Sequence, residues 1–436
     1  MKPPGPSGLP LLGVLPGLAR DPAGLCAAAQ REYGPVVRLP VPRGAVYLLT
    51  EPEHIEHVLV HRNRNHWKGR LFNRADFLFG RGLVLADGEQ WRRQRRLMQP
   101  AFGQERVARL VPTLVDVIER RAQRWERPSR EGAVVEMEAE MMSLTLDLIC
   151  RAMFTVGVSD DELDRTAAAF GVVLNHLGLR FATFTFPEWV PIPGQRRARR
   201  ALRFLDELVY RIIDERAAGN GPAPDDLLAM LTEARDEDGR VMTRRELRDQ
   251  VITVLFGGYE ATAHSMAWTW SLIDRHPDVD ARFRAEIAAA ATVADLPYTR
   301  QILNESLRLY PPFWEVLRSS YQADEIGGYE IPANASVLLC PFVTHRLPHL
   351  WPDPDAFRPE RFGAGVPAAH RYAHFPFGAG QRLCIGQHLA MLEMQLILWV
   401  LGRRIRPRLG SPGPVPHRAQ STLRSKAGIH MVLEPA

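Results

Sequence analysis

The sequence has few cysteines and no long hydrophobic run, and each absence excludes a class of protein. Four cysteines occur in 436 residues, and none forms a CxxC pair or another zinc-type spacing: Cys26, Cys150, Cys340 and Cys384. Neither a disulfide framework nor a structural zinc site is therefore indicated. The Pro-rich segment 1–20 is interrupted too often to form the apolar helix of about 20 residues that spans a bilayer, and it lacks a signal-peptide layout. We expect a cytoplasmic protein without a membrane span.

The chain also lacks a linker and a strong charge bias. It has 55 basic and 50 acidic side chains, a net charge of +5, and the basic residues are dispersed. This balance argues against nucleic acid and suits an acidic protein partner or an anionic cofactor. No Ser/Gly-rich or charge-block segment separates domains, and the 46% of apolar residues can fill a large core. The sequence predicts one large domain over residues 1–436.

What the chain does contain is mostly helical pattern, with short strand-like segments near both ends. We expect a helix over 22–33 and strands over 36–41 and 45–50, around a turn at Arg43-Gly44. From 89 to 290 the pattern is mainly helical, with breaks near 128, 187–194 and 219–224. Later segments predict a helix over 299–310, strand-like pieces in 327–339, a loop over 351–362 and a closing hairpin from 421. The predicted fold class is mainly α with a minor antiparallel β component.

One helix is predicted with unusual clarity. Thr243 and Glu246 have capping-box spacing, and the helical pattern continues to about His276, where Pro277 stops it. Roughly 33 residues at about 1.5 Å each give a length of ~50 Å. The middle of this segment is almost wholly apolar, so the helix must cross the core.

Cys384 lies in an unusual setting, the stretch FPFGAGQRLCIGQHLA (375–390), in which three glycines surround it and a helix-forming run follows. A helix N-terminus stabilises a thiolate. The glycines at 378, 380 and 386 let the backbone curl around the sulfur and bring a flat ligand close. Haem iron is one partner that fits this arrangement, and a buried structural cysteine in a Gly-rich turn is the alternative.

This stretch resembles the FxxGxRxCxG signature of the cytochrome P450 superfamily through Phe377, Gly380, Arg382, Cys384 and Gly386. The resemblance implies one haem b, with Cys384 as the proximal iron ligand. It also implies that Phe377 shields the sulfur and that Arg382 lies near a haem propionate.

Two further segments resemble the same family. Glu305 and Arg308 share a helix face at i, i+3, as in the ExxR helix, and Arg361 lies in a PERF segment. The resemblance implies a structural triad of these three residues, whereas the alternative for the first two is an ordinary surface ion pair.

Trp91 and Arg95 at i, i+4, and Arg318 further on, resemble residues that bond the propionates. A solvated basic helix with a cation–π pair is the alternative. It remains a good interpretation of the neighbouring Arg92, Arg93 and Arg96. With Arg403 and Arg404, these three could also dock an acidic electron carrier.

The middle of the long helix departs from the family. Gly257 and Gly258 cost about 1 kcal/mol each relative to alanine, which suggests a local widening or a close ligand approach. Glu260 is a candidate proton relay, or a carboxylate satisfied by nearby backbone or arginine. The family has a threonine after this acid, but here the position is Ala261, and Thr262 is rotated by about 100°. We expect a substrate hydroxyl or an ordered water to complete the relay. Loss of electrons to peroxide, or the use of peroxide, is the alternative.

The resemblance as a whole implies a soluble bacterial type of monooxygenase, which oxidises a hydrophobic small molecule with O₂. A separate ferredoxin or flavodoxin with its reductase would supply the electrons. The candidate pocket residues are mostly apolar: Leu78, Phe79, Val254, Leu255, Phe313 and Trp314. By analogy, the substrate is a terpenoid or polyketide-like intermediate of secondary metabolism. The alternatives are a haem sensor that does not turn over and a scaffold protein without haem.

Overall fold

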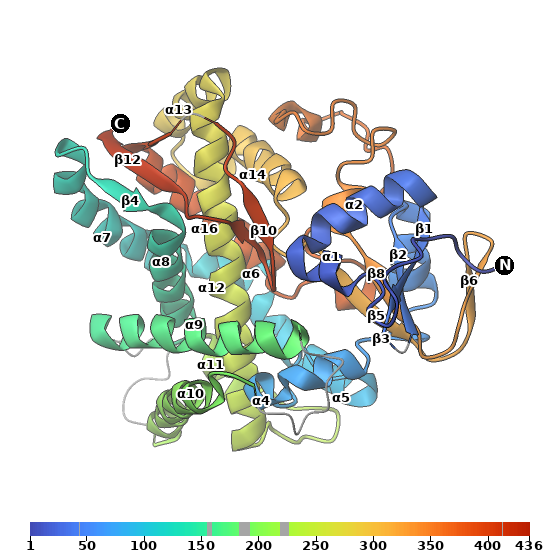
Figure 1. Ribbon diagram of the computed structural model, residues 1–436. Helices are drawn as coiled ribbons and strands as arrows, with labels where there is room; N and C mark the ends of the chain where they lie inside the picture. Colours follow the sequence, from blue (N-terminus) through green and yellow to red (C-terminus); the bar gives the residue numbers. More distant parts are fainter. Residues whose placement is uncertain (43, 155–158, 183–191, 219–225, 412) are drawn as a thin grey trace.

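A 32-residue helix, α12 (Arg244–Arg275), runs through the middle of the molecule, and the other helices pack around it (Figure 1). This computed structural model describes residues 1–436 apart from 43, 155–158, 183–191, 219–225 and 412. The predicted breaks at 187–191 and 219–224, and Arg43 of the predicted turn, lie outside the described residues. The predicted break near Pro128 corresponds to the end of α7, which continues through this proline and ends at Arg130.

The helices confirm the predicted class. Besides α12 they are α1 (Leu15–Arg20), α2 (Pro22–Tyr33), α3 (Pro52–Glu56), α4 (Asp76–Phe79), α5 (Gly88–Met98), α6 (Gln104–Arg109), α7 (Val111–Arg130), α8 (Met137–Met153), α9 (Asp160–Ala182), α10 (Gln195–Ala217), α11 (Leu227–Glu233), α13 (Pro277–Ala289), α14 (Pro297–Leu309), α15 (Pro341–Thr344) and α16 (Gln387–Gly402). Short 3₁₀ or π turns include η1 (His57–His61), η5 (Pro359–Phe362) and η6 (Gly380–Arg382).

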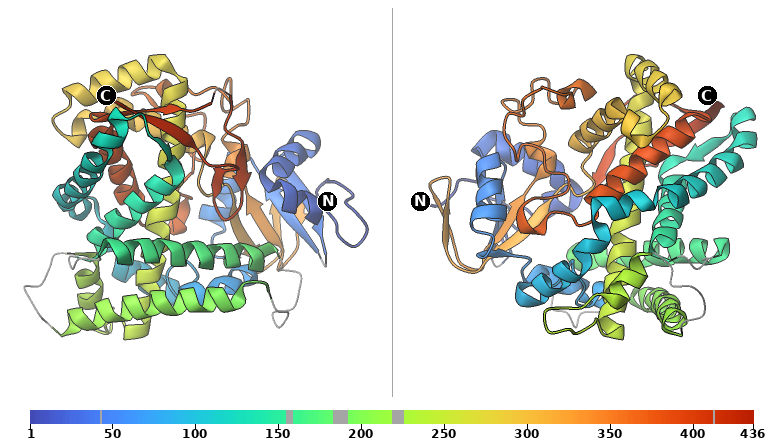
Figure 2. Two further views of the ribbon diagram at one scale, coloured as in Figure 1. Left: turned by 60° about the vertical axis from the view of Figure 1, so that its left-hand side comes forward. Right: turned by 180° about the vertical axis from the view of Figure 1, so that it is seen from behind.

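The ends of α12 follow from its sequence, as predicted. The hydroxyl of Thr243 accepts a hydrogen bond from the Glu246 amide at 3.2 Å, and the Thr243 amide donates to the Glu246 carboxylate at 2.8 Å. Two of the otherwise unpaired amides at the helix start are thereby satisfied. α8 packs along α12, and α16 lies against its other side when the molecule is seen from behind (Figure 2). The helix is therefore fixed from both sides and can position side chains accurately.

A small β-rich region stands beside the helices, covered by α1 and α2 (Figures 1 and 2). Its five-stranded sheet has the order β1 (Val36–Val41), β2 (Gly44–Leu49), β8 (Ser336–Leu339), β5 (Val316–Ser320) and β3 (His66–Trp67). β2 and β8 pair in parallel, whereas the other pairs are antiparallel. The predicted component was antiparallel only. The parallel pair arises because most of the chain separates the two strands, and a long connection permits either direction.

The C-terminal strands differ from the predicted closing hairpin. β12 (His430–Pro435) pairs with β9 (Ile405–Leu409) and β4 (Val134–Glu136), while β11 (Leu423–Ser425) pairs with β10 (His417–Ala419). β6 (Asp324–Ile326) and β7 (Tyr329–Ile331) form a separate pair. The tail does not fold on itself because Met431 and Leu433 of β12 are fully buried, and strands on both sides complete its hydrogen bonds.

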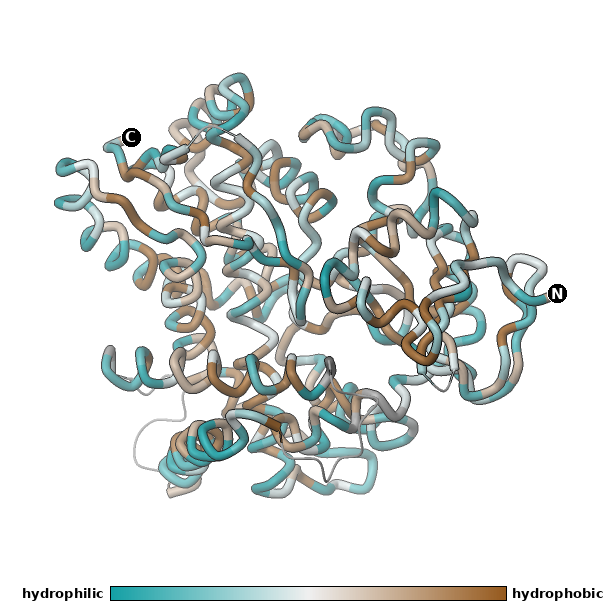
Figure 3. Tube along the Cα trace, viewed as in Figure 1, coloured by the Kyte–Doolittle hydropathy of each residue, from teal (hydrophilic) through white to brown (hydrophobic). Residues whose placement is uncertain are grey.

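Hydrophobic segments lie on the inward faces and hydrophilic segments on the outer turns (Figure 3). The largest fully buried side chains include Trp268, Trp270 and Tyr259 of α12. Trp268 stacks on Tyr310 with ring centroids 3.9 Å apart. Within the described ranges, no helix combines the length and the apolar character needed to cross a bilayer.

Candidate cofactor and active site

The loop before α16 presents Cys384 at the start of that helix. Gly378 and Gly380 have φ of 71° and 65°, in the region that favours glycine. A Cβ at Gly380 would lie 2.0 Å from the carbonyl oxygen of Leu59, so a side chain there would displace the backbone of η1. Gly386 has an ordinary φ of −87°, so the turn itself does not require glycine at that position. Two of the three glycines thus shape the loop as predicted.

Cys384 is an exposed residue, although protein atoms surround its sulfur closely enough to disfavour the charged form. Burial raises the pKa of this thiol, while the Gly386 amide and the charge of Arg95 act in the opposite direction. The Cys384 amide donates to the Phe377 carbonyl at 2.9 Å, which closes the loop. A thiol held this way loses its proton when a metal cation bonds the sulfur.

A cluster of cations lies near the same loop. Arg382 of η6 bonds Asp87 and donates to the Ala86 carbonyl at 2.8 Å, and its guanidinium lies 4.4 Å from the centroid of the Trp91 ring. Arg318 of β5 is buried and lines the same pocket as Trp91 and Arg382. We call Lys68, Arg318 and Arg382 the cation cluster.

The cation cluster has too little negative charge of its own. Burial and the charge of Arg382 lower the pKa of Arg318 to about 10. Burial and the two arginines lower the pKa of Lys68 well below its ordinary value, and Asp87 is the carboxylate that acts against both shifts. Three cations around one carboxylate favour an anionic ligand with two acidic groups.

Arg95 lies on the other side of this arrangement. Its guanidinium donates to the Leu383 carbonyl at 2.9 Å and to the Gln99 side chain at 3.2 Å, so it supports the cysteine loop. Trp91 is buried on α5, and Phe377 is half-buried against the core. The predicted propionate contacts of Trp91 and Arg95 remain predictions.

The structure brings Glu305, Arg308 and Arg361 together. Glu305 and Arg308 have side chains without exposed area, and two hydrogen bonds of 2.7 and 2.8 Å join them. Arg361 of η5 donates to Glu305 at 3.2 Å. Arg308 also donates to the carbonyls of His345, Pro354 and Ala356, which lie in the segment before the cysteine loop.

The middle of α12 has one accessible face. Gly257 is exposed, and Thr253, Phe256 and Ala261 are half-buried, at the spacing of a single helical stripe. Val254 and Leu255, predicted to line the pocket, are buried, as is Thr262; Val254 is on the face of Gly257 and Ala261, whereas Leu255 and Thr262 face away from it. The accessible position next to the acid is therefore Ala261, which carries no hydroxyl.

The two glycines of α12 do not widen the helix, which remains α-helical through both. The predicted widening is wrong, and close packing explains one glycine instead. A Cβ at Gly258 would lie 2.8 Å from the Ile149 side chain of α8, whereas one at Gly257 would meet nothing within 4 Å. Gly258 thus lets two helices approach, and Gly257 leaves the accessible stripe open.

The other four pocket candidates also differ in exposure to solvent. Phe313 is 39% exposed, while Trp314 is buried and donates to the Gln420 carbonyl at 2.7 Å. Leu78 and Phe79 are buried, and Phe79 contacts the accessible stripe through Phe256 at a centroid distance of 4.9 Å. The pocket role of all six remains a prediction.

The arginines predicted to dock an electron carrier have partners within the chain. Arg93 pairs with Asp236 and Glu246, Arg96 with Glu237, and Arg92 with Glu89. Arg404 pairs with Glu119 and Glu126, and Arg403 donates to backbone carbonyls. This part of the surface is thus less positive than the sequence suggested.

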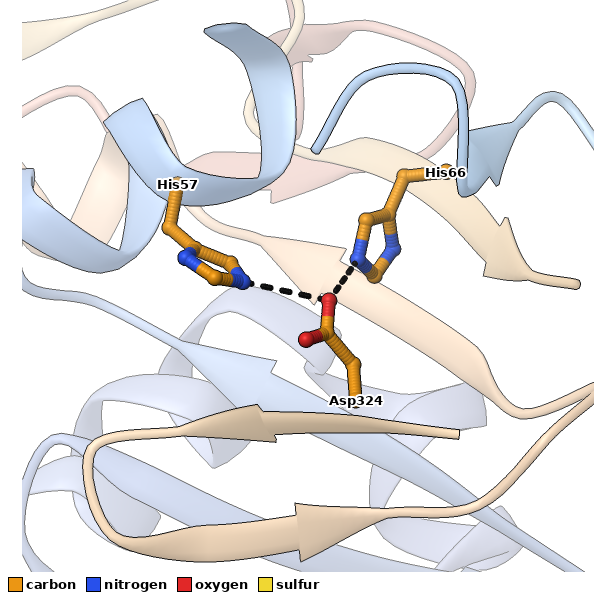
Figure 4. A group of neighbouring side chains, drawn as sticks. All are labelled: His57, His66 and Asp324. Atoms are coloured by element: carbon orange, nitrogen blue, oxygen red, sulfur yellow. Dashed lines mark hydrogen bonds and ion pairs between the residues drawn. The ribbon is translucent and has the colours of Figure 1, made fainter. Parts of the chain in front are cut away.

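A histidine–aspartate group lies at the edge of the pocket (Figure 4). The Nε2 atoms of His57 and His66 lie 3.1 and 2.8 Å from one oxygen of Asp324, and His66 lines the pocket of the cation cluster. These are ligand types that zinc accepts. However, the two imidazoles already satisfy the carboxylate, and Arg62 lies 3.9 Å from its other oxygen. We assign this group as a clamp that joins η1, β3 and β6.

Sequence reasoning missed Lys68 and Asp87 of the site and the whole His57–His66–Asp324 clamp. Each lies far along the chain from its partners, and none carries a periodic or motif signal. An excess of cations beside the predicted propionate residues was the one available signal for Lys68.

Comparisons with known proteins agree with this geometry. The family model described as Cytochrome P450 matches residues 3–414. The chain is 32% identical to Cyclooctatin synthase of Streptomyces melanosporofaciens, over 99% of this chain and 95% of that protein. It is 34% identical to Cyclooctat-9-en-7-ol 5-monooxygenase of the same organism, over 94% and 89% of the two chains.

A third relative and one solved structure extend the likeness. Pentalenene oxygenase of Streptomyces avermitilis is 30% identical, over 90% of this chain and 88% of that protein. The crystal structure of the cytochrome P450DA haem domain superposes with a TM-score of 0.90 at 26% identity, covering 100% of this chain and 97% of that one. Sequence and fold therefore point to the same family.

Haem fits the donor groups of the site. It brings an iron that accepts a thiolate and two propionate carboxylates. The chain offers the thiol of an exposed cysteine at a helix start, which would hold the iron, and the cation cluster, which would hold the propionates. Because the family model and the relatives cover nearly the whole chain and these donors fit haem, the chain belongs to the cytochrome P450 family of haem-thiolate oxidoreductases.

Proposed function

We propose that this chain is a monooxygenase that oxidises a hydrophobic terpenoid intermediate. The observation that carries the proposal is the position of Cys384, an exposed residue at the start of α16, near a cation cluster that has Asp87 as its one carboxylate partner among the described residues. Haem bound there supplies the oxygen-activating chemistry. The residues of the chain hold the cofactor, exclude water and orient the substrate.

The substrate class is supported by the accessible side chains and by the relatives. Phe256, Gly257, Ala261 and Phe313 present apolar or very small groups, which suit a hydrocarbon skeleton. Three relatives are named for cyclooctatin, cyclooctat-9-en-7-ol and pentalenene. A terpenoid hydrocarbon or its mono-oxygenated product is therefore the proposed substrate.

A separate ferredoxin or flavodoxin is proposed as the electron source. Such carriers are acidic, and the arginines around α5 would have to exchange their internal partners for the carrier. Docking that exchanges one ion pair for another weakens as salt is added, because exposed charges are screened. We therefore expect the rate of reduction by an acidic carrier to fall as the salt concentration is raised from about 0.05 to about 0.5 M. Over this range the Debye length shortens from about 14 to about 4 Å.

The test of cofactor ligation is the absorption spectrum of the reduced protein with carbon monoxide. A strongly red-shifted Soret band is expected for the native chain, and its loss is expected in Cys384→Ser. Cys150→Ser is the matched control, because Cys150 is buried in α8 away from the loop. A native spectrum typical of histidine-ligated haem would overturn the proposal.

The substrate class is tested by titrating terpenoid hydrocarbons and their alcohols into the ferric protein. A ligand that enters the pocket shifts the spin state of the haem, and matched linear fatty acids serve as the comparison. Tighter binding of fatty acids than of all terpenoids tested would contradict the proposed substrate class.

A further inference from the structure

A buried network of charges surrounds Glu260, which lies one turn beyond Phe256 and Gly257 on the same face of α12 as the accessible stripe. Glu138 begins α8, Glu260 and His264 lie one turn apart on α12, and Arg424 lies on β11. Their side chains are 10%, 3%, 3% and 28% exposed. The network therefore joins the central helix, its main packing partner and the β10–β11 hairpin.

His264 contacts a different carboxylate with each of its ring nitrogens. Its Nδ1 lies 3.2 Å from Glu138 Oε1, and its Nε2 lies 3.8 Å from Glu260 Oε1. An imidazole can take up a proton at one nitrogen and release one from the other, which makes histidine suited to moving protons. An imidazole held only for packing would not need a carboxylate at both ends.

The charges of the network balance around a protonated His264. Burial acts to lower the pKa of His264, but the hydrogen bonds and charges of Glu138 and Glu260 raise it above its ordinary 6.5. Burial acts to raise the pKa of Glu138, but the bonds from His264 and Ser425 leave it below its ordinary value. Ser425 donates to Glu138 through its amide at 2.8 Å and its hydroxyl at 2.6 Å. The contacts between the two groups thus favour the charged form of each.

The network has an outer and an inner end. Glu138 is the more exposed of the two carboxylates, so it is the one that can exchange protons with solvent. At the inner end, Thr422 of the hairpin donates its hydroxyl to Glu260 Oε1 at 3.1 Å, and Arg424 lies 3.8 Å from the same oxygen. Among the described residues, Oε2 of Glu260 and the hydroxyl of Tyr259 have no hydrogen-bond partner. One oxygen of the acid is fixed, and the other remains able to take or give a proton.

We propose that Glu138, His264 and Glu260 form a proton path into the active site, with Thr422 supplying to the acid the hydroxyl that position 261 lacks. The imidazolium of His264 releases its Nε2 proton to Glu260, which leaves a neutral imidazole with its proton on Nδ1. After the imidazole returns to the tautomer with its proton on Nε2, Glu138 takes a proton from solvent and gives it to Nδ1, which restores the imidazolium, so that only N–H and O–H bonds change. The contact of 3.8 Å shortens for the second step, which the partly unpaired Glu260 side chain permits. His264 and Glu138 act through Glu260 and are positioning residues. This inference rests on the proposed monooxygenase function.

The charge state of His264 is tested by ¹⁵N NMR of the histidine-labelled, reduced carbon monoxide complex, which is diamagnetic. The signals absent from His264→Gln identify the residue. We expect an imidazolium at pH 7, and we expect its pKa to fall in Glu138→Gln, which retains a side chain able to bond Ser425. A neutral His264 at pH 7 in the native chain would overturn the path.

Proton delivery is tested by the product formed and peroxide released per electron pair, with a surrogate ferredoxin and a ligand that shifts the spin state. We expect about tenfold less product per electron in His264→Gln, a smaller factor than the roughly 10²–10⁴ of a group that transfers the proton directly, because His264 acts through Glu260. In the native chain this yield falls as pH rises through the pKa of His264, and in the variant it is low and flat. His276→Gln is the matched control, since His276 ends the same helix and bonds only the Leu272 carbonyl at 2.7 Å.

The possible failures are distinguishable. Loss of the red-shifted Soret band in the native chain would contradict the proposed function, and the NMR titration of His264 can be read in either case. A normal band together with native product yield in both His264→Gln and Glu138→Gln would contradict the path alone. If His264→Gln does not fold, Glu138→Gln decides, because the amide can keep the contacts of the carboxylate.

Discussion

The molecule contains two buried groups of charged side chains that are similar in composition. They differ in how completely their hydrogen-bonding atoms are paired. In the triad of Glu305, Arg308 and Arg361, short hydrogen bonds join the charges, and Arg308 has three further carbonyl acceptors. In the network of His264 the contacts between charges reach 3.8 Å, and Oε2 of Glu260 and Nε of Arg424 have no hydrogen-bond partner within the described part of the chain. Both groups lie in the core.

The difference separates support from chemistry. Buried charges must be paired and hydrogen-bonded, and the triad meets this condition completely, so no proton can move there without a large loss of interaction. The network of His264 leaves part of its hydrogen-bonding capacity free, which destabilises the fold slightly and allows protons to change place. The completeness of hydrogen bonding thus distinguishes a buried group of charges that supports the fold from one that can pass protons.

The largest effect is expected from breaking the triad. Glu305→Gln leaves the buried guanidinium of Arg308 without its counter-charge, and removal of one partner of a buried pair costs about 3–5 kcal/mol. The measurement is the free energy of unfolding in urea, together with the fraction of protein that retains haem. Glu360→Gln is the control, because its pair with Arg282 is 56% exposed on both sides and contributes at most about 1 kcal/mol. Equal losses in the two variants would remove the distinction between buried and exposed pairs here.

A smaller and pH-dependent effect is expected from the network. The folded pKa of His264 is raised, so its contribution to stability is complete below 6.5 and is lost as pH rises through the folded pKa. His264→Gln should therefore be destabilised most at pH 6, by about 3 kcal/mol, and should approach the native chain at pH 9. Urea unfolding at several pH values measures this difference. A gap that widens with pH would show that His264 is neutral in the folded protein.

Glu393 is a third buried carboxylate, and it shows the effect of burial without a hydrogen-bond partner at Oε1 in the described part of the chain. Glu393 of α16 is 1% exposed, its Oε1 has no hydrogen-bond partner among the residues that the structure describes, and burial raises its pKa to about 8. Because this value lies above the ordinary 4.5, the native chain loses stability as pH rises from about 4.5 to 8. Glu393→Gln lacks this loss and should gain about 4 kcal/mol relative to the native chain between pH 5 and pH 9, at about 1.4 kcal/mol per pKa unit. If the difference in the free energy of unfolding did not change with pH, Glu393 would have a partner that offsets the effect of burial on its pKa.

The smallest effect is expected from restoring the family's threonine. Ala261→Thr puts a hydroxyl on the accessible stripe, next to an acid that already accepts a hydrogen bond from Thr422. Product per electron should change far less than the roughly tenfold loss expected for His264→Gln. A large gain in Ala261→Thr would show that Thr422 does not replace the missing hydroxyl.

Features with local signals were predictable from the sequence. The cap at Thr243 and the stop at Pro277 gave the bounds of α12, because both act through neighbouring backbone groups. The glycines around Cys384 indicated a loop at a helix start, and two of them have the expected positive φ.

The remainder depended on contacts between distant segments. α12 is apolar nearly all round, so its sequence could not show that Phe256 and Ala261 are accessible while Leu255 is buried on another face. Glu138 lies 126 residues before His264, and nothing in the local pattern of either residue indicates the other. Packing decides such pairs, and single-sequence patterns do not report it.

The parallel pairing of β2 with β8 sets the order in which the chain can fold during synthesis. Val46 pairs with Ser336, and a ribosome adding about 5–20 residues per second needs on the order of 15–60 s to make the intervening chain. During that time the β1–β2 hairpin presents an unpaired edge that other chains can join. Slow expression at low temperature prolongs this exposure, whereas a chaperone that covers the edge of β2 shields it until β8 is made.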